Sequence, residues 1–122
     1  MANKLQLEWK KIKDPLTKQV ETFKKTKSGW NTEPLEKILK KMNLNFGDTL
    51  GKAGDAFKAN KGTDVTKYCA KAVETAEKYQ ALLGTLPKNR GDGGIDYAAK
   101  MNPLIATLKK TQAGGMTATD PF

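Results

Sequence analysis

The side chains best able to move protons in this chain are carboxylates, because the sequence contains no histidine. Three pairs of acids would share one face if their segments are helical: Glu33 with Glu36, Glu74 with Glu77, and Asp92 with Asp96. General acid–base catalysis could use such a pair if burial raised the pKa of one carboxyl. Nothing in the sequence marks these acids as buried, and the lysine four residues after Glu74 favours a solvated ion pair.

Nucleophilic catalysis and metal binding lack the residues that they need. Ser28 is the only serine and Cys69 the only cysteine, and no histidine is present as a base or nitrogen ligand. Asp92 and Asp96 supply too few oxygens for calcium, which takes six to eight. The sequence therefore predicts a protein that is not an enzyme and that holds no metal and no cofactor.

A short glycine-containing segment at residues 47–53 superficially resembles a phosphate-binding loop. It is one residue short between its glycines, and Ala53 stands where a hydroxyl should hold magnesium, so we reject that reading. Gly47, Gly51 and Gly54 instead follow helical spacing, which predicts a close approach of another backbone within the bundle. A helix that accepts a partner at these glycines is the alternative.

The charge is strongly positive and unevenly distributed. The chain of 122 residues has a net charge of +9, and Arg90 is its only arginine. Residues 1–27 carry eight lysines and three acids, a net charge of +5. Lysine attracts anions but lacks the planar fork with which arginine reads bases, so sequence-specific nucleic-acid recognition is poorly supported.

Apolar residues recur at helical spacing through most of the chain and nowhere alternate as in a strand. The first stripe contains Leu5, Trp9, Ile12, Leu16, Val20 and Phe23. Further stripes predict helices that begin at Glu33, Phe46, Thr63 and Ile95, with the second ending near Asn43–Asn45 and a loop over residues 85–94. The prediction is an all-α protein, an irregular bundle of four to five helices.

The sequence leaves one helix boundary open, and it predicts one domain boundary from the loss of helical periodicity. Asp14-Pro15 interrupts the first stripe, so Pro15 either kinks one long helix or begins a second, and the unbroken phase of the stripe favours the kink. Periodicity stops after residue 112. We therefore predict one helical-bundle domain over residues 1–112 and a flexible C-terminal tail over residues 113–122.

The basic first helix carries most of the predicted function. We expect a non-enzymatic interaction or structural module that binds an acidic protein, or a second copy of itself, through Trp9, Lys10, Lys11, Lys13, Lys18, Lys24, Lys25 and Trp30. Trp30 is either a lid on the core or an interface anchor. For the apolar stripe itself, an ordinary helix face buried in the bundle is the favoured interpretation, because any surface helix of a bundle needs one.

Two other partners remain open for the same lysines. The alternative function is sequence-independent nucleic-acid binding, and peripheral membrane contact is less favoured. The lone cysteine and the absence of an uninterrupted apolar run at the start predict a cytoplasmic protein without a signal peptide.

Overall fold

The computed structural model describes residues 2–26, 33–84 and 96–122. These residues form α1 (Lys4–Thr26), α2 (Glu33–Lys58), α3 (Gly62–Leu83), α4 (Tyr97–Lys100), α5 (Asn102–Gly114) and a 3-10 turn, η1 (Gly115–Thr117). No strand occurs in the described part of the chain. The predicted all-α bundle of four to five helices is therefore confirmed.

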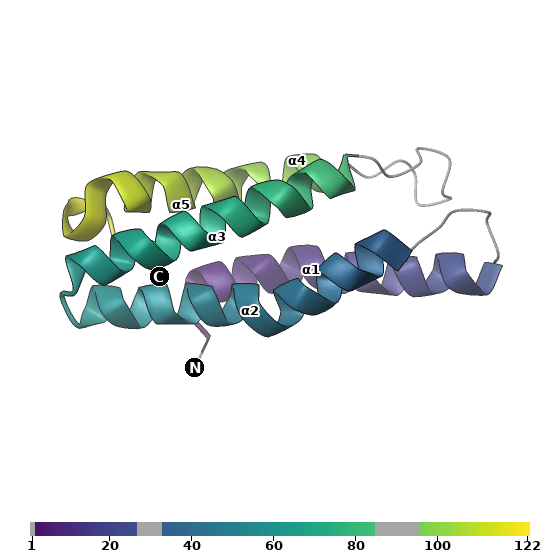
Figure 1. Ribbon diagram of the computed structural model, residues 1–122, viewed down its shortest axis with the longest axis horizontal. Coiled ribbons are helices and arrows are strands. Elements are labelled where there is room, and N and C mark those ends of the chain that lie inside the picture. The colour runs from purple at the N-terminus through teal and green to yellow at the C-terminus, as the bar shows by residue number, and fades with distance from the viewer. Residues whose placement is uncertain (1, 27–32, 85–95) are drawn as a thin grey trace.

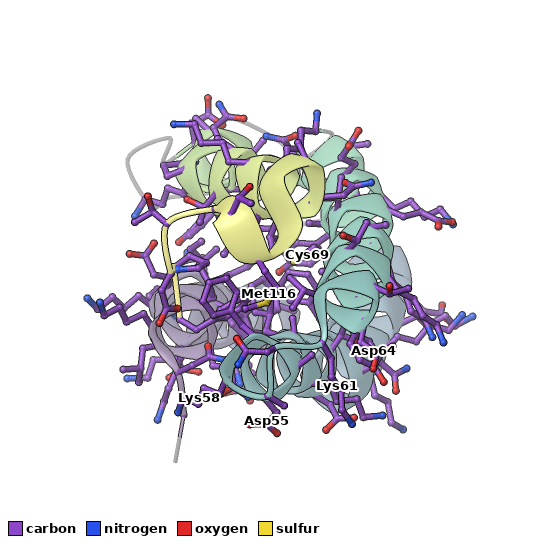
Figure 2. The ribbon with its side chains drawn as sticks, turned by 90° about the vertical axis from the view of Figure 1, so that its left-hand side faces the viewer. Asp55, Lys58, Lys61, Asp64, Cys69 and Met116 are labelled. Atoms are coloured by element: carbon purple, nitrogen blue, oxygen red, sulfur yellow. The ribbon has the colours of Figure 1, made fainter. Side chains whose placement is uncertain are left out.

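The four long helices lie side by side along one axis, and the short α4 leads into α5 (Figure 1). Viewed from the end at which α2 turns into α3, the helices α1, α2, α3 and α5 surround a common interior (Figure 2). Cys69 and Met116 point into that interior in the same view. One core therefore serves the whole bundle.

The start of α1 is held by a reciprocal pair of hydrogen bonds between Asn3 and Gln6. The backbone N–H of Gln6 donates to Asn3 Oδ1 at 2.9 Å, and the backbone N–H of Asn3 donates to Gln6 Oε1 at 2.8 Å. This is a capping box, which satisfies N–H groups that have no partner within the first turn. Its effect is to fix where α1 begins.

Pro15 lies inside α1, which continues through it as one helix. Two separate helices, one of the two predicted possibilities, are therefore wrong. Leu16 and Val20 remain buried on the same side as Leu5 and Ile12, which precede the proline. Pro15 has no backbone N–H, so α1 lacks one hydrogen bond at this position. The helix tolerates this loss because its apolar face stays buried on both sides of the proline.

The predicted helix end near Asn43–Asn45 is wrong, because α2 runs from Glu33 to Lys58 without interruption. Phe46 follows Met42 by four residues, so the apolar stripe keeps its phase. Asparagine is only modestly unfavourable inside a helix, and Asn45 faces solvent. Glu33, at which the sequence predicts a helix start, belongs to α2, and the residues just before it lie outside the described part of the chain.

The turn between α2 and α3 depends on Asn60, which has a positive φ of 57°. The N–H of Asn60 donates to the carbonyl of Phe57 at 3.2 Å, and that of Lys61 donates to the carbonyl of Ala56 at 2.9 Å. This pattern closes the end of a helix when a left-handed residue follows it, and asparagine tolerates that conformation. The chain therefore reverses within three residues, which makes α2 and α3 antiparallel neighbours.

Residues 113–122, predicted to be a flexible tail, lie against the bundle. The helix α5 extends to Gly114, and the ring of Phe122 lies 5.7 Å from that of Phe57 between centroids. The carbonyl of Phe122 also accepts a hydrogen bond from the N–H of Lys4 at 3.1 Å. The predicted boundary after residue 112 is thus corrected: loss of helical period signals the end of a helix, not the end of packing.

Candidate interaction surfaces

Trp9, predicted from the sequence to bind a partner, is a core residue with 3% of its surface exposed. Its ring meets Phe46 of α2 and Tyr79 of α3 edge-on, at centroid distances of 5.0 and 5.2 Å. A side chain that joins three helices in this way is not available to a partner. The prediction for Trp9 is therefore wrong, because its stripe is the face of α1 that the bundle buries.

The predicted lysines with described side chains lie away from this core. Three of them are exposed: Lys10, Lys11 and Lys18. Lys13 is partly buried, and its Nζ lies 3.9 Å from Oδ1 of Asp14. Exposed or half-exposed ion pairs of this kind contribute little to stability, so these lysines are not explained by packing.

The remaining predicted residues fall outside what the structure describes. Lys24 and Lys25 belong to the last turns of α1, but their side chains are not among the described ones. Trp30 lies outside the described residues altogether. Their roles in binding stay predictions.

The outer face of α1, defined here as Lys4, Leu7, Lys11 and Lys18, contains a residue that the sequence analysis missed. Among the described residues, Leu7 is the one large hydrophobic residue that is exposed, with 49% of its surface accessible. Lysines recur every seven residues on this face, and a straight helix drifts by only about 20° over that interval. Leu7 was detectable because it is out of phase with the buried stripe.

The carboxylates that could have formed a catalytic pair are on the surface. Glu74 pairs with Lys78 at 3.3 Å, and Glu77 pairs with Lys109 at 3.5 Å. Glu33 pairs with Lys37 at 3.6 Å. None of the described Asp and Glu side chains is buried, and those residues form no cluster of metal-binding type. Asp92 lies outside the described residues, and Asp96 caps α4 by accepting from the N–H of Ala99.

Ionisable side chains that are buried in the core include Cys69 and Tyr79. Burial raises the pKa of the Cys69 thiol to about 11 and raises the pKa of the Tyr79 hydroxyl well above its ordinary value. Both groups are therefore neutral at physiological pH. The Tyr79 hydroxyl has no hydrogen-bond partner among the described residues. A neutral, inaccessible thiol is a packing residue, not a reactive one.

The glycines of α2 face the capped start of α1. A Cβ at Gly51 would lie 2.8 Å from Gln6 Nε2, and a Cβ at Gly54 would lie 2.6 Å from Asn3 Nδ2. Both distances are shorter than real side chains allow. Side-chain amides, and not another backbone as predicted, thus lie close to Gly51 and Gly54, whereas Gly47 has open space where its Cβ would be.

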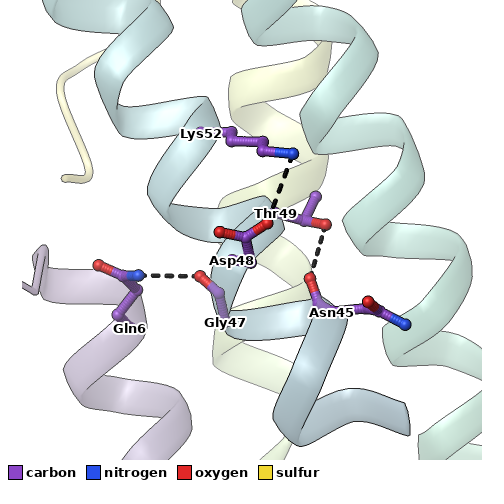
Figure 3. A network of polar contacts seen from close by, with 6 residues as sticks. All are labelled: Gln6, Asn45, Gly47, Asp48, Thr49 and Lys52. Carbon is purple, nitrogen blue, oxygen red and sulfur yellow. Dashed lines mark hydrogen bonds and ion pairs between the residues drawn. The ribbon is translucent and has the colours of Figure 1, made fainter.

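The same two amides also join the helices. Gln6 Nε2 donates to the carbonyl of Gly47 at 2.8 Å (Figure 3), and Asn3 Nδ2 donates to the carbonyl of Leu50 at 2.9 Å. Each amide therefore caps α1 with its oxygen and reaches α2 with its nitrogen. Gly51 and Gly54 therefore let the start of α1 lie close to α2, and both also line a surface pocket of about 380 Å³ beside this contact.

The chain matches no known protein family, no curated protein and no protein of solved structure. Within the described residues, every helix is too short or too polar to cross a membrane.

Proposed function

We propose that the protein is a non-enzymatic binding module that holds an acidic surface of another protein against the outer face of α1. The observation that carries this proposal is Leu7, which is 49% exposed among Lys4, Lys11 and Lys18. Protein interfaces combine an apolar contact at the centre with a polar rim. The outer face of α1 has this composition, and the lysines require an acidic counterpart.

A second copy of the chain is a poorer occupant of this face. Most homodimers are two-fold symmetric, so the same patch lies on both sides of the interface. The lysines of one α1 would then approach those of the other, and like charges repel. Self-association would need a different surface.

A nucleic acid and a membrane also fit this face less well. Contacts with a phosphate backbone are electrostatic, so the exposed apolar side chain of Leu7 would contribute nothing to them. A helix that lies on a membrane inserts its apolar side, and the apolar side of α1 is buried under α2 and α3. An acidic protein is the occupant that uses both the lysines and the leucine.

The proposal includes a cytoplasmic location. Cys69 is the single cysteine of the chain and is buried as a free thiol, which suits a reducing compartment. A protein partner would then be met inside the cell.

The test begins by capturing partners from a nuclease-treated cell extract on the immobilised protein. Each captured protein is then purified, and its affinity is measured by calorimetry for the wild type, Leu7→Ser, Lys11→Glu and Lys110→Glu. Lys110 lies on α5 and is exposed, so Lys110→Glu matches the charge change of Lys11→Glu at another site. We expect Leu7→Ser and Lys11→Glu each to weaken binding about tenfold or more, and Lys110→Glu to change it little.

Two results would contradict the proposal. Equal affinity of all four proteins for every captured partner would show that the outer face of α1 is not the interface. Equal loss in Lys11→Glu and Lys110→Glu, with no effect of Leu7→Ser, would reduce the interaction to net charge.

A further inference from the structure

A second basic surface lies between α2 and α3, away from the outer face of α1. The antiparallel helices enclose a groove of about 500 Å³, with Lys41 and Lys52 on the α2 side and Lys71 and Lys78 on the α3 side. Figure 3 shows the α2 side, from which Asn45, Thr49 and Lys52 project toward α3, opposite the side that Gln6 contacts. No sequence pattern indicates this groove, because its lysines come from two helices with little excess charge of their own.

The charge of the groove is not neutralised from within. Asp48 is the only acid among the described residues that line it, and its carboxylate pairs with Lys52 at 3.4 Å. Lys78 pairs with Glu74 at 3.3 Å. Lys41 and Lys71 form no ion pair with any described residue, and both are exposed. Two ammonium groups without a described counter-ion inside a concave surface concentrate a positive field.

The residues that line the groove also indicate which kind of anion it would bind. Among the described residues, the side chains that line it are lysines, threonines, an asparagine and an aspartate, with no apolar or aromatic side chain. A bound peptide would lack the apolar anchors on which helix-in-groove recognition depends. Single strands would lack rings on which their bases stack, and without arginine the groove lacks the planar fork that most often reads guanine.

We propose that this groove holds the phosphate backbone of a double-stranded nucleic acid without reading its sequence. Helical rise places Lys71 and Lys78 about 10 Å apart along α3, and Lys41 and Lys52 about 16 Å apart along α2. The four charges are thus spread along the groove and suit an extended chain of phosphates better than one small anion. The surface and the occupant differ from those proposed for α1, so either proposal can fail without the other.

The test measures the affinity for a fluorescently labelled duplex of arbitrary sequence by anisotropy, over a series of salt concentrations. The variant Lys41→Ala/Lys71→Ala removes the two groove lysines that have no ion pair. Its matched control, Lys11→Ala/Lys18→Ala, removes two exposed lysines from α1 and leaves the same net charge. We expect the log–log salt slope to fall by roughly 2 in the groove variant and to stay unchanged in the control, since each phosphate contact contributes about 0.9.

A gain of affinity provides a test that damage to the fold cannot imitate. Asp48→Asn removes the carboxylate that lines the groove and releases Lys52, so binding should tighten and the salt slope should rise by about 1. Asp14→Asn is the matched control, because Asp14 is also paired with a lysine but lies on α1. It should leave the slope unchanged.

Four outcomes would overturn the proposal. The first two are failure of the wild-type protein to bind duplex at low salt and equal effects of the groove and α1 variants on binding. The third is tighter binding of a labelled single strand than of duplex. The fourth is displacement of the labelled duplex by a short polyglutamate peptide at a lower concentration of charge than unlabelled duplex needs. Circular dichroism and thermal unfolding of each variant establish that its helices are intact.

Discussion

The two faces of α1 differ in what a large apolar side chain does there. On the inner face, Trp9 is packed between Phe46 and Tyr79 and is 3% exposed. On the outer face, Leu7 is 49% exposed and lies among lysines. The two residues are only two positions apart, so their roles follow from the phase of the helix and not from residue type. An aromatic residue in a periodic stripe belongs to the core, whereas a leucine out of phase with the stripe marks a surface with another purpose.

The largest expected effect lies on the inner face. Trp9→Ala should lower the free energy of unfolding by about 3–5 kcal/mol, because it removes a buried ring that contacts three helices. Lys10→Ala, the next residue on the exposed side, should change it by less than about 0.5 kcal/mol. Urea unfolding followed by circular dichroism gives both values. A small loss for Trp9→Ala would mean that the contrast between the faces is false.

The second largest effect is a loss of stability at alkaline pH, and it comes from ionisable side chains buried in the core. Burial raises the pKa of the Cys69 thiol to about 11 in the folded chain, so the unfolded chain loses this proton first, from about pH 9. The unfolded state then binds fewer protons, and stability falls between pH 9 and 11 by on the order of 1 kcal/mol per pH unit. Above pH 10 the buried Tyr79 hydroxyl adds to this fall, since burial raises its pKa too.

The comparison of wild type with Cys69→Ala isolates the contribution of the thiol. Between pH 9 and 10, the stability of Cys69→Ala should depend on pH less steeply than that of the wild type. The exposed lysines are common to both proteins and cancel in the difference. Parallel curves in this window would show that the thiol reaches solvent in the folded state.

A third prediction compares two glycines of α2. Gly47→Ala should stabilise the protein by about 0.5–1 kcal/mol, because its Cβ would meet nothing within 4 Å and alanine favours a helix. Gly54→Ala gains the same propensity but displaces the Asn3 amide from its hydrogen bond to the carbonyl of Leu50. The two variants should therefore differ by about 1 kcal/mol in urea unfolding. Equal stabilisation would show that the amide contact between α1 and α2 contributes nothing.

Most of the fold was predictable because apolar periodicity reports helices directly. The stripe through Leu5 and Val20 predicted α1, and the helical spacing after Glu33 predicted the first part of α2. The predicted break at Asn43–Asn45 failed because residue propensity was given more weight than the unbroken phase between Met42 and Phe46. The capping box at Asn3 and Gln6 was visible in the sequence as two amides three residues apart, although asparagine replaces the usual serine or threonine.

The surfaces were less predictable because they depend on which helices become neighbours. The lysines of α1 could be assigned to one helix from sequence, and Lys10 and Lys11 are exposed as expected. Lys41 and Lys71 are 30 positions apart, and only the antiparallel packing of α2 and α3 brings them to one groove. The contact of Phe122 with Phe57 likewise has no local signal. Long-range pairing of this kind leaves no periodic trace.

The smallest expected change in stability is on the outer face of α1, and it is the one that separates function from folding. Leu7→Ser should change the free energy of unfolding by less than about 0.5 kcal/mol, because the side chain is already half in solvent. Leu5→Ser is the matched control: Leu5 is 4% exposed, so the same substitution there should cost several kcal/mol. Thermal unfolding of both variants measures the contrast. If Leu7→Ser were as costly as Leu5→Ser, Leu7 would be part of the core, and the outer face of α1 would lose the apolar contact on which its proposed protein interface depends.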